Sequence, residues 1–279
     1  MALATLAVTA GRPDKVPDAP LNTPITMAAT YVAGGEVEYG RYGNPTWTAL
    51  EDALGALEGG RCLTFASGLA AVATVLDLVG KEGKVVVPKH AYTGTIMQLA
   101  DLESRGRLTA EMVDITDTDA VVAACDGAAL VWLESPTNPA LEVADIPAIT
   151  KAAHDAGAYV VVDNTFATPL LQRPLEDDVD LVVHSATKYL AGHSDVQMGA
   201  IVSIVLAQGE MAADLLSRKT RLWIHATSLG GVESSLERRR RWKAEAATIP
   251  EGLVRLSVGI EDVEDLWEDL RAALDGCVG

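Results

Sequence analysis

The chain has 279 residues, of which 49% are hydrophobic and 22% charged, a composition typical of a folded globular protein. Its 22 Lys and Arg residues stand against 39 Asp and Glu residues, and the net charge of −17 disfavours binding to nucleic acid or to anionic membranes. Three scattered cysteines and no apolar run of membrane-spanning length predict a cytoplasmic protein without a disulfide framework or a metal site.

The N-terminal part of the chain predicts an arm rather than a packed unit. Residues 1–45 are rich in Pro, Gly and Thr and show little periodicity, so we expect an extended segment that contacts a partner subunit. From Trp47 the apolar residues recur at helical spacing, and the pair Gly59-Gly60 predicts the end of that helix.

Short apolar runs then alternate with helical or loop stretches. The runs are residues 84–88, 129–135, 158–164 and 180–185. Because they lack the alternation of a half-exposed strand, they indicate strands buried on both faces of a largely parallel sheet. The predicted fold class is therefore α/β.

Polar residues directly follow three of these runs. In chain order they are Glu134, Ser135 and Asn138, then Asp163, Asn164 and Thr165, then Ser185, Thr187 and Lys188. Each of them alone is more often a helix cap or a turn residue. However, ligands of such sheets bind at the carboxyl ends of the strands, and the set matches the needs of pyridoxal phosphate. Lys188 would form the Schiff base, Asp163 would pair with the ring nitrogen, and hydroxyl groups would hold the phosphate.

A second motif supports an anion site. In the stretch FASGLAA, Ser67 and Gly68 precede an amphipathic helix, whose free backbone N–H groups and dipole favour a phosphate group. An ordinary helix cap explains this motif about as well when it is considered alone. Together with Lys188, the motif favours the phosphate interpretation.

These stretches resemble the Cys/Met-metabolism family of fold-type I pyridoxal-phosphate enzymes, which includes cystathionine γ-synthases, cystathionine γ-lyases and methionine γ-lyases. The motifs are YGRYGNPTWTALE, FASGLAA, HAYTGT, ESPTNP, VVDNTFATPLLQRPLE, HSATKYLAGHSDV, ATSLGGVESS and EGLVRLSVGIED. The resemblance implies a mostly parallel sheet flanked by helices, with a smaller C-terminal domain. It also implies that pyridoxal 5'-phosphate is the cofactor and that a sulfur amino acid is the substrate.

The resemblance also implies roles for individual residues. Lys188 would carry the cofactor and shuttle protons, and Tyr92 would stack on the ring and act as a second acid or base. The other residues at the cofactor would be Asp163, Thr165, Asn138, Ser67, Gly68, Leu69, Ser185 and Thr187. Tyr39 and Arg41 would reach the phosphate of the neighbouring subunit, which implies a homodimer or homotetramer. Arg255 would clamp the substrate carboxylate, with Asn138 and Ser228 nearby.

The chain departs from the family pattern in length. Family members continue through more sheet and a long helix after the lysine motif, whereas here the two flanking segments join at about residues 199–202, which indicates an internal deletion. We expect the arm over residues 1–45, a cofactor-binding domain over 46–200 and a shortened domain over 201–279. The last helix of that domain would pack through Val263, Leu266, Leu270 and Ala273. If the shortened domain keeps its place, residues 200–206 form a strand of the small sheet and Arg255 reaches the cavity of Lys188. We expect this domain to dock imperfectly and the activity to be weak or absent relative to a full-length relative.

The motifs leave the reaction open between two classes. Thr227 stands where many cystathionine-using members have Glu, and Gly94 where methionine γ-lyases have Cys, so neither substrate is favoured. We predict elimination or replacement at Cγ or Cβ, with γ-lyase chemistry ahead of γ-synthase chemistry. The alternative of another class is a chain that folds or binds cofactor without turnover. The basic run at residues 237–243 is interpreted as a solvated face or a subunit contact.

Overall fold

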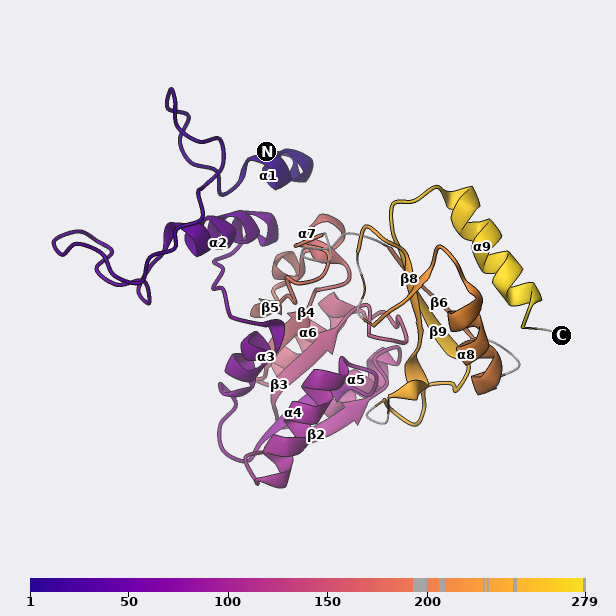
Figure 1. The fold of residues 1–279 in the computed structure, drawn as a ribbon. Helices are drawn as coiled ribbons and strands as arrows, with labels where there is room; N and C mark the ends of the chain where they lie inside the picture. The colour runs from indigo at the N-terminus through magenta and orange to yellow at the C-terminus, as the bar shows by residue number, and fades with distance from the viewer. Residues whose placement is uncertain (193–199, 206–208, 228, 230, 243–244, 278–279) are drawn as a thin grey trace.

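A computed structural model describes residues 1–192, 200–205, 209–227, 229, 231–242 and 245–277. Its larger sheet has the strand order β2-β1-β3-β4-β5, and every neighbouring pair is parallel (Figure 1). The strands are β1 (Gly83–Pro88), β2 (Leu108–Val113), β3 (Ala128–Glu134), β4 (Tyr159–Asp163) and β5 (Leu181–Val183). The predicted α/β class and the four apolar strands are confirmed, and β2 is a strand that the sequence did not indicate.

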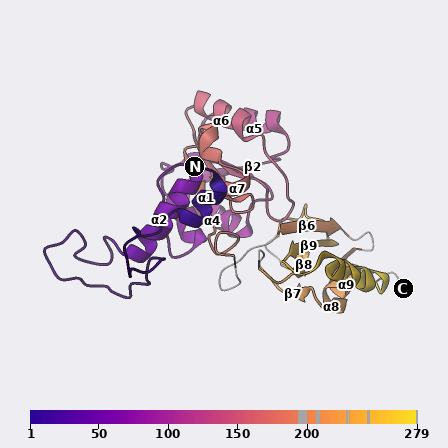
Figure 2. The same ribbon diagram turned by 90° about the horizontal axis from the view of Figure 1, so that it is seen from above.

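Helices cover both faces of this sheet (Figure 2). Helices α3 (Gly68–Leu76) and α4 (Thr93–Ser104) pack on one face, against Leu130 and Trp132 of β3. Helices α5 (Thr118–Ala124) and α6 (Ile146–Asp155) pack on the other face, against Val131 and Leu133. These four residues of β3 are all at most 2% exposed, so successive side chains enter opposite cores, as expected for a central strand. The short α7 (Thr168–Leu171) and η1 (Pro174–Asp177) precede β5.

The N-terminal segment lies mostly away from the larger sheet (Figures 1 and 2). It contains one short helix, α1 (Leu3–Thr9), which contradicts the prediction of a purely extended arm. None of the α1 residues is buried, so the helix adds no core of its own. Helix α2 (Pro45–Glu58) follows, capped by the side chain of Asn44 and ended by Gly59 at φ 86°, which confirms the predicted stop.

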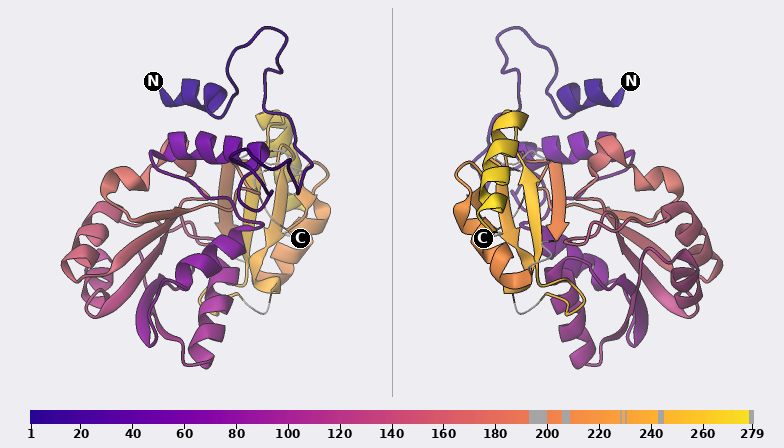
Figure 3. Two further views of the ribbon diagram at one scale, coloured as in Figure 1. Left: turned by 90° about the vertical axis from the view of Figure 1, so that its left-hand side faces the viewer. Right: turned by 90° about the vertical axis from the view of Figure 1, so that its right-hand side faces the viewer.

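A second sheet contains the C-terminal part of the chain (Figure 3). Its strand order is β6-β9-β8-β7, in which β9 is antiparallel to β6 and β8. The strands are β6 (Ala200–Val205), β7 (Ile224–His225), β8 (Ser235–Arg238) and β9 (Leu253–Val258), accompanied by η2 (Arg239–Arg241). The strand expected over residues 200–206 is therefore present as β6, and it extends the small sheet.

Two helices, α8 (Gly209–Lys219) and α9 (Val263–Asp275), share one core with β8 and β9. Leu236 of β8 and Leu256 of β9 face this core, so their neighbours Glu237 and Arg255 lie on the opposite face. In α9, Leu266, Leu270 and Ala273 are buried as predicted, but Val263 is 71% exposed because it occupies the first helical position. Within the described ranges, no helix combines the length and apolar character needed to cross a bilayer.

Candidate active site

A cavity of about 520 Å³ lies at the carboxyl ends of β3, β4 and β5, where the second sheet approaches the first. Seven of the predicted site residues line it: Tyr92, Asn138, Asp163, Thr165, Ser185, Lys188 and Arg255. The first six lie at or beyond the carboxyl ends of β1, β3, β4 and β5 of the larger sheet, whereas Arg255 comes from β9. The cavity therefore lies at the edge of the sheet where the strand-end rule predicts a ligand site.

Lys188 lies five residues beyond the end of β5 and is the amine of the cavity. Burial, together with the charges of Arg255 and Arg239, lowers the pKa of Lys188 below its ordinary value. The environment therefore favours the neutral amine, which is the form that attacks a carbonyl group.

Asp163 ends β4 and is 8% exposed. Its Oδ1 accepts hydrogen bonds from Thr165 Oγ1 at 2.5 Å and from Thr165 N at 3.0 Å. Thr165 Oγ1 in turn accepts a bond from Ser185 N at 2.8 Å, which links the ends of β4 and β5. Burial raises the pKa of Asp163, although the Thr165 hydrogen bonds and the charge of His184 act against this shift. A cationic ring N–H group in the cavity would offset the free-energy cost of burying the Asp163 carboxylate.

Glu134 lies directly opposite Asp163 in the β3–β4 register and connects two other cavity residues. Its Oε2 accepts a bond from Tyr92 N and its Oε1 accepts one from Asn138 N, both at 2.7 Å. Burial and the nearby Asp163 raise the pKa of Glu134 well above its ordinary value. Glu134 thereby fixes the backbone from which Tyr92 and Asn138 extend into the cavity.

The start of α3 approaches β5 closely. A Cβ atom on Gly68 would lie 3.1 Å from both Cα and Cβ of Ser185, so only glycine fits without a shift. Ser67 caps α3 by accepting a bond from Ala70 N, so the ordinary cap interpretation is correct for its side chain. The first turn of this helix, whose N–H groups have no partner within the helix, nevertheless lies beside Ser185, which lines the cavity.

Several predicted site residues do not line the cavity of the described chain. Leu69 and Thr187 are exposed near it, and Ser67 and Gly68 lie behind Ser185. Tyr39 and Arg41 belong to the arm, where the Arg41 guanidinium lies 4.8 Å from the Tyr39 ring centre. Ser228 lies outside the described residues, while Thr227 and Leu229 on either side of it line the cavity.

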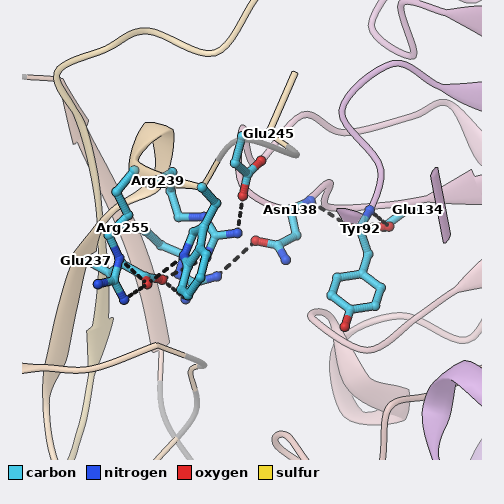
Figure 4. A network of polar contacts seen from close by, with 9 residues as sticks. Tyr92, Glu134, Asn138, Glu237, Arg239, Glu245 and Arg255 are labelled. Carbon is cyan, nitrogen blue, oxygen red and sulfur yellow. Dashed lines mark hydrogen bonds and ion pairs between the residues drawn. The ribbon is translucent and has the colours of Figure 1, made fainter. Parts of the chain in front are cut away.

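The second sheet closes the cavity with charged residues (Figure 4). Arg255 is 3% exposed and donates a hydrogen bond from Nη1 to Asn138 Oδ1 at 3.0 Å. Arg255 therefore reaches the cavity despite the shortening of the chain. Arg239, Trp242 and Glu245 also line the cavity and were not predicted. They belong to or follow the basic run at residues 237–243, so the interpretation of that run as a solvated face is wrong for its buried members.

The donor set fits pyridoxal phosphate. The cavity offers an amine of lowered pKa, a buried carboxylate and the hydroxyl groups of Thr165 and Ser185, and the start of α3 lies beside Ser185. These are the groups that hold the aldehyde carbon, the ring nitrogen and the phosphate of this cofactor. In the described part of the chain, no group of three His, Cys, Asp or Glu residues is arranged to hold a metal ion.

Comparisons with known proteins agree with this chemistry. The model of the family described as Cys/Met metabolism PLP-dependent enzyme matches residues 4–212 and 197–275. The cystathionine gamma-synthase of Mycobacterium tuberculosis is 34% identical over 374 residues, which cover 97% of this chain and 96% of the relative. Among solved structures, the cystathionine gamma lyase CalE6 of Micromonospora echinospora has a TM-score of 0.91 at 31% identity and covers 99% of this chain and 100% of that one.

The alignment also locates the missing segment. Since 97% of 279 residues is about 271, about 100 of the 374 aligned positions have no counterpart in this chain. Residues 197–212 belong to both stretches that the family model matches. The junction predicted at residues 199–202 falls within this overlap, so the comparisons confirm the internal shortening.

Proposed function

The chain belongs to the Cys/Met metabolism family of PLP-dependent enzymes, and on that premise we propose that it eliminates or replaces the side-chain substituent of a sulfur amino acid. Relatives with both lyase and synthase names match it, including a cystathionine beta-lyase of Bacillus subtilis that is 40% identical over 186 residues, 64% of this chain and 48% of the relative. We propose γ-lyase chemistry first and γ-synthase chemistry as the second candidate. Pyridoxal 5'-phosphate is the cofactor of the family.

One observation carries the proposal: Lys188, Asp163 and Arg255 line the same cavity. Lys188 would bind the cofactor covalently, and Asp163 would accept a bond from the ring nitrogen. Ser185, Thr187 and the N–H groups after Ser67 would hold the phosphate. When bound, the cofactor supplies an electron-withdrawing ring that stabilises negative charge at the substrate Cα.

The substrate carboxylate would bind to Arg255. Its guanidinium offers two parallel N–H groups, the geometry that fits a carboxylate, and Asn138 orients it through the 3.0 Å bond. Because burial and the charge of Arg239 lower the pKa of Arg255 only to about 10, the side chain stays cationic near neutral pH. Placing the carboxylate here leaves the substrate Cα between Arg255 and Lys188.

Proton transfer would then use this chain's own groups. The amine of Lys188 would remove the proton from Cα, because its lowered pKa leaves more of the neutral base available. Tyr92, held through its backbone by Glu134, would serve as the second acid or base near the leaving group. The partly buried ring of Phe166 lines the cavity and would reduce the access of water to the leaving thiol.

We further propose that a second copy of the chain completes the site. Tyr39 and Arg41 lie outside the cavity of their own chain but match the residues that reach a neighbour's phosphate in the family. The arm carries exposed apolar side chains, such as Met27 at 93% and Val32 at 94%, which a partner surface would cover. Mixing Lys188→Ala chains with Arg41→Ala chains tests this proposal. If the sites are shared, a mixed dimer has one site with both Lys188 and Arg41, and activity should be recovered. If each chain forms its site alone, mixing should recover no activity.

Two assays separate the candidate reactions. The holoprotein is supplied either with cystathionine alone or with an activated homoserine ester and cysteine. Release of cysteine, ammonia and a 2-oxo acid in the first assay supports the lyase, and formation of cystathionine in the second supports the synthase. A holoprotein that binds cofactor but turns over neither substrate contradicts the proposal.

A further inference from the structure

A buried carboxylate behind the cavity wall contacts two arginines that line the cavity. Glu237 is 0% exposed and is not one of the described residues that line the cavity. Its Oε2 accepts hydrogen bonds from Arg239 Nη1 at 2.8 Å and from Arg255 Nη2 at 3.4 Å (Figure 4). A single oxygen atom therefore holds both guanidinium groups.

The backbone fixes the contact between Glu237 and Arg255. In the antiparallel pair of β8 and β9, Glu237 lies directly opposite Arg255, and their side chains share the face turned away from the helices. Arg239 follows two residues later, at the start of η2. The distance between the carboxylate and the two cations thus depends on the sheet, not on flexible surface side chains.

The second oxygen of Glu237 is also engaged. Its Oε1 accepts bonds from Arg241 Nε and from Trp242 Nε1, both at 2.9 Å. Although burial alone raises the pKa of Glu237, the bonds from Arg241 and Trp242 and the charges of Arg239 and Arg255 lower it below its ordinary value. The carboxylate is therefore ionised near neutral pH and cannot rotate away from the cavity arginines.

Two guanidinium groups side by side repel each other. The charge of Arg239 contributes to the lowered pKa of Arg255, whereas Glu237 and Glu245 act in the opposite direction. Arg239 also donates a bond to Glu245, so a second carboxylate holds it from the other side. Loss of Glu237 would remove a carboxylate that accepts hydrogen bonds from both Arg239 and Arg255.

We propose that Glu237 is a positioning residue of the substrate site, which holds the guanidinium groups of Arg239 and Arg255 next to each other from behind the cavity wall. The affinity of the cavity for a substrate carboxylate then depends on a side chain that the substrate does not touch. This inference rests on the proposed function in one respect, the assignment of Arg255 to the substrate carboxylate.

The test compares two ligands that differ only in the carboxylate. L-Alanine carries the α-amino and α-carboxylate groups without a leaving group, and L-alaninamide lacks the negative charge. Calorimetric titration of the holoprotein gives both dissociation constants and their ratio. A change that merely loosened the fold would weaken both ligands and leave the ratio unchanged.

We expect Glu237→Gln to reduce the preference for L-alanine over L-alaninamide by about tenfold or more, since a charge-assisted bond to the clamp is lost. Glu210→Gln is the matched control. Glu210 accepts a bond from Arg238 at 2.9 Å within the same arginine run, but Arg238 does not line the cavity. This control should keep the wild-type preference.

A second variant covers the case in which Glu237→Gln fails to fold. The double variant Glu237→Gln, Arg241→Gln removes one negative and one positive charge together and should lose the preference to the same extent. If either folded variant keeps the full preference for the carboxylate, the inference is wrong while the proposed function stands. If the wild-type holoprotein shows no preference for L-alanine, the assignment of Arg255 is wrong and the inference falls with it.

Discussion

Arg255 of the second sheet donates a hydrogen bond to Asn138, which follows β3 of the first sheet, with 3.0 Å between Nη1 and Oδ1. Both side chains are buried, at 3% and 8% exposure, so the contact joins the two sheets at the cavity. A site that draws residues from two sheets depends on their relative position. The following predictions test its parts separately.

Arg255→Ala should weaken binding of the amino-acid substrate by about 2–5 kcal/mol, because the guanidinium is buried and already oriented by Asn138. Titration of the holoprotein with substrate measures the loss. Arg255→Lys keeps the charge but not the paired N–H groups, and should restore only part of the affinity. Unchanged affinity in the alanine variant would mean that the second sheet does not contribute to substrate binding.

Lys188→Ala should abolish covalent attachment of pyridoxal phosphate while leaving the fold intact, because Lys188 lies beyond the end of β5 and is only partly buried. Borohydride reduction followed by peptide mass analysis should label Lys188 in the wild type and no residue in the variant. Circular dichroism checks the fold. A label on another lysine in the wild-type protein would refute the assignment.

The lowered pKa of Lys188 predicts a pH effect. Burial and the charges of Arg255 and Arg239 disfavour the protonated amine, so the neutral form should persist to lower pH than in an ordinary lysine. In Arg255→Met one of these charges is gone, and the pH profile for cofactor attachment should move upward. Arg105→Met, which changes the exposed arginine directly after α4, is the control and should leave the profile in place.

Asp163→Asn should lower kcat by about 10²–10³, the usual effect of losing one preorganised electrostatic partner. The amide can still accept the bonds from Thr165, so the cavity should keep its shape and bind the cofactor. Asp145→Asn is a matched control, because Asp145 only caps α6 and Asn is an equally good cap. Equal turnover in the Asp163 variant and the wild type would contradict a role at the ring nitrogen.

Gly68→Ala should weaken cofactor binding, because the added methyl group would lie 3.1 Å from the Ser185 backbone and push the start of α3 away from β5. We expect a stability cost of about 1–3 kcal/mol in thermal unfolding and a larger dissociation constant for pyridoxal phosphate. Gly80→Ala, where nothing lies within 4 Å of the added atom, should change neither quantity. If both variants behave alike, the close approach is not needed for the site.

The central strands could be predicted from the sequence because both of their faces are buried. Every residue from Leu130 to Leu133 is at most 2% exposed, so the chain shows a continuous apolar run. Strand β2 gave no such signal: it is at the edge of the sheet, and its sequence LTAEMV mixes buried and exposed positions. Edge strands carry polar residues on their open side, which removes the pattern that identifies them.

The residues that the larger sheet brings to the cavity could be predicted from the sequence, whereas Arg239, Trp242 and Glu245 on the side of the second sheet could not. Asp163 and Lys188 follow strand ends, and the rule for parallel sheets brings them together. Arg239 stood in a run of four arginines, which sequence reasoning places in solvent because an unpaired buried charge is costly. Only the fold brings Glu237 and Glu245 against it. Glu237 directly precedes the run of arginines in a chain of net charge −17, and this was the sequence feature that could have indicated a buried, paired arginine.

The place of β6 at the margin of the second sheet affects how the protein behaves when concentrated. Among the described residues β6 pairs only with β9, so no described strand pairs with the backbone N–H and C=O groups on its other side. Its sequence AIVSIV contains neither a charge nor a proline. Such a segment can pair with its counterpart in another molecule, the first step of strand-mediated aggregation. The shortening that joins the two family segments at β6 therefore makes this strand the part of the molecule to protect during purification and crystallisation.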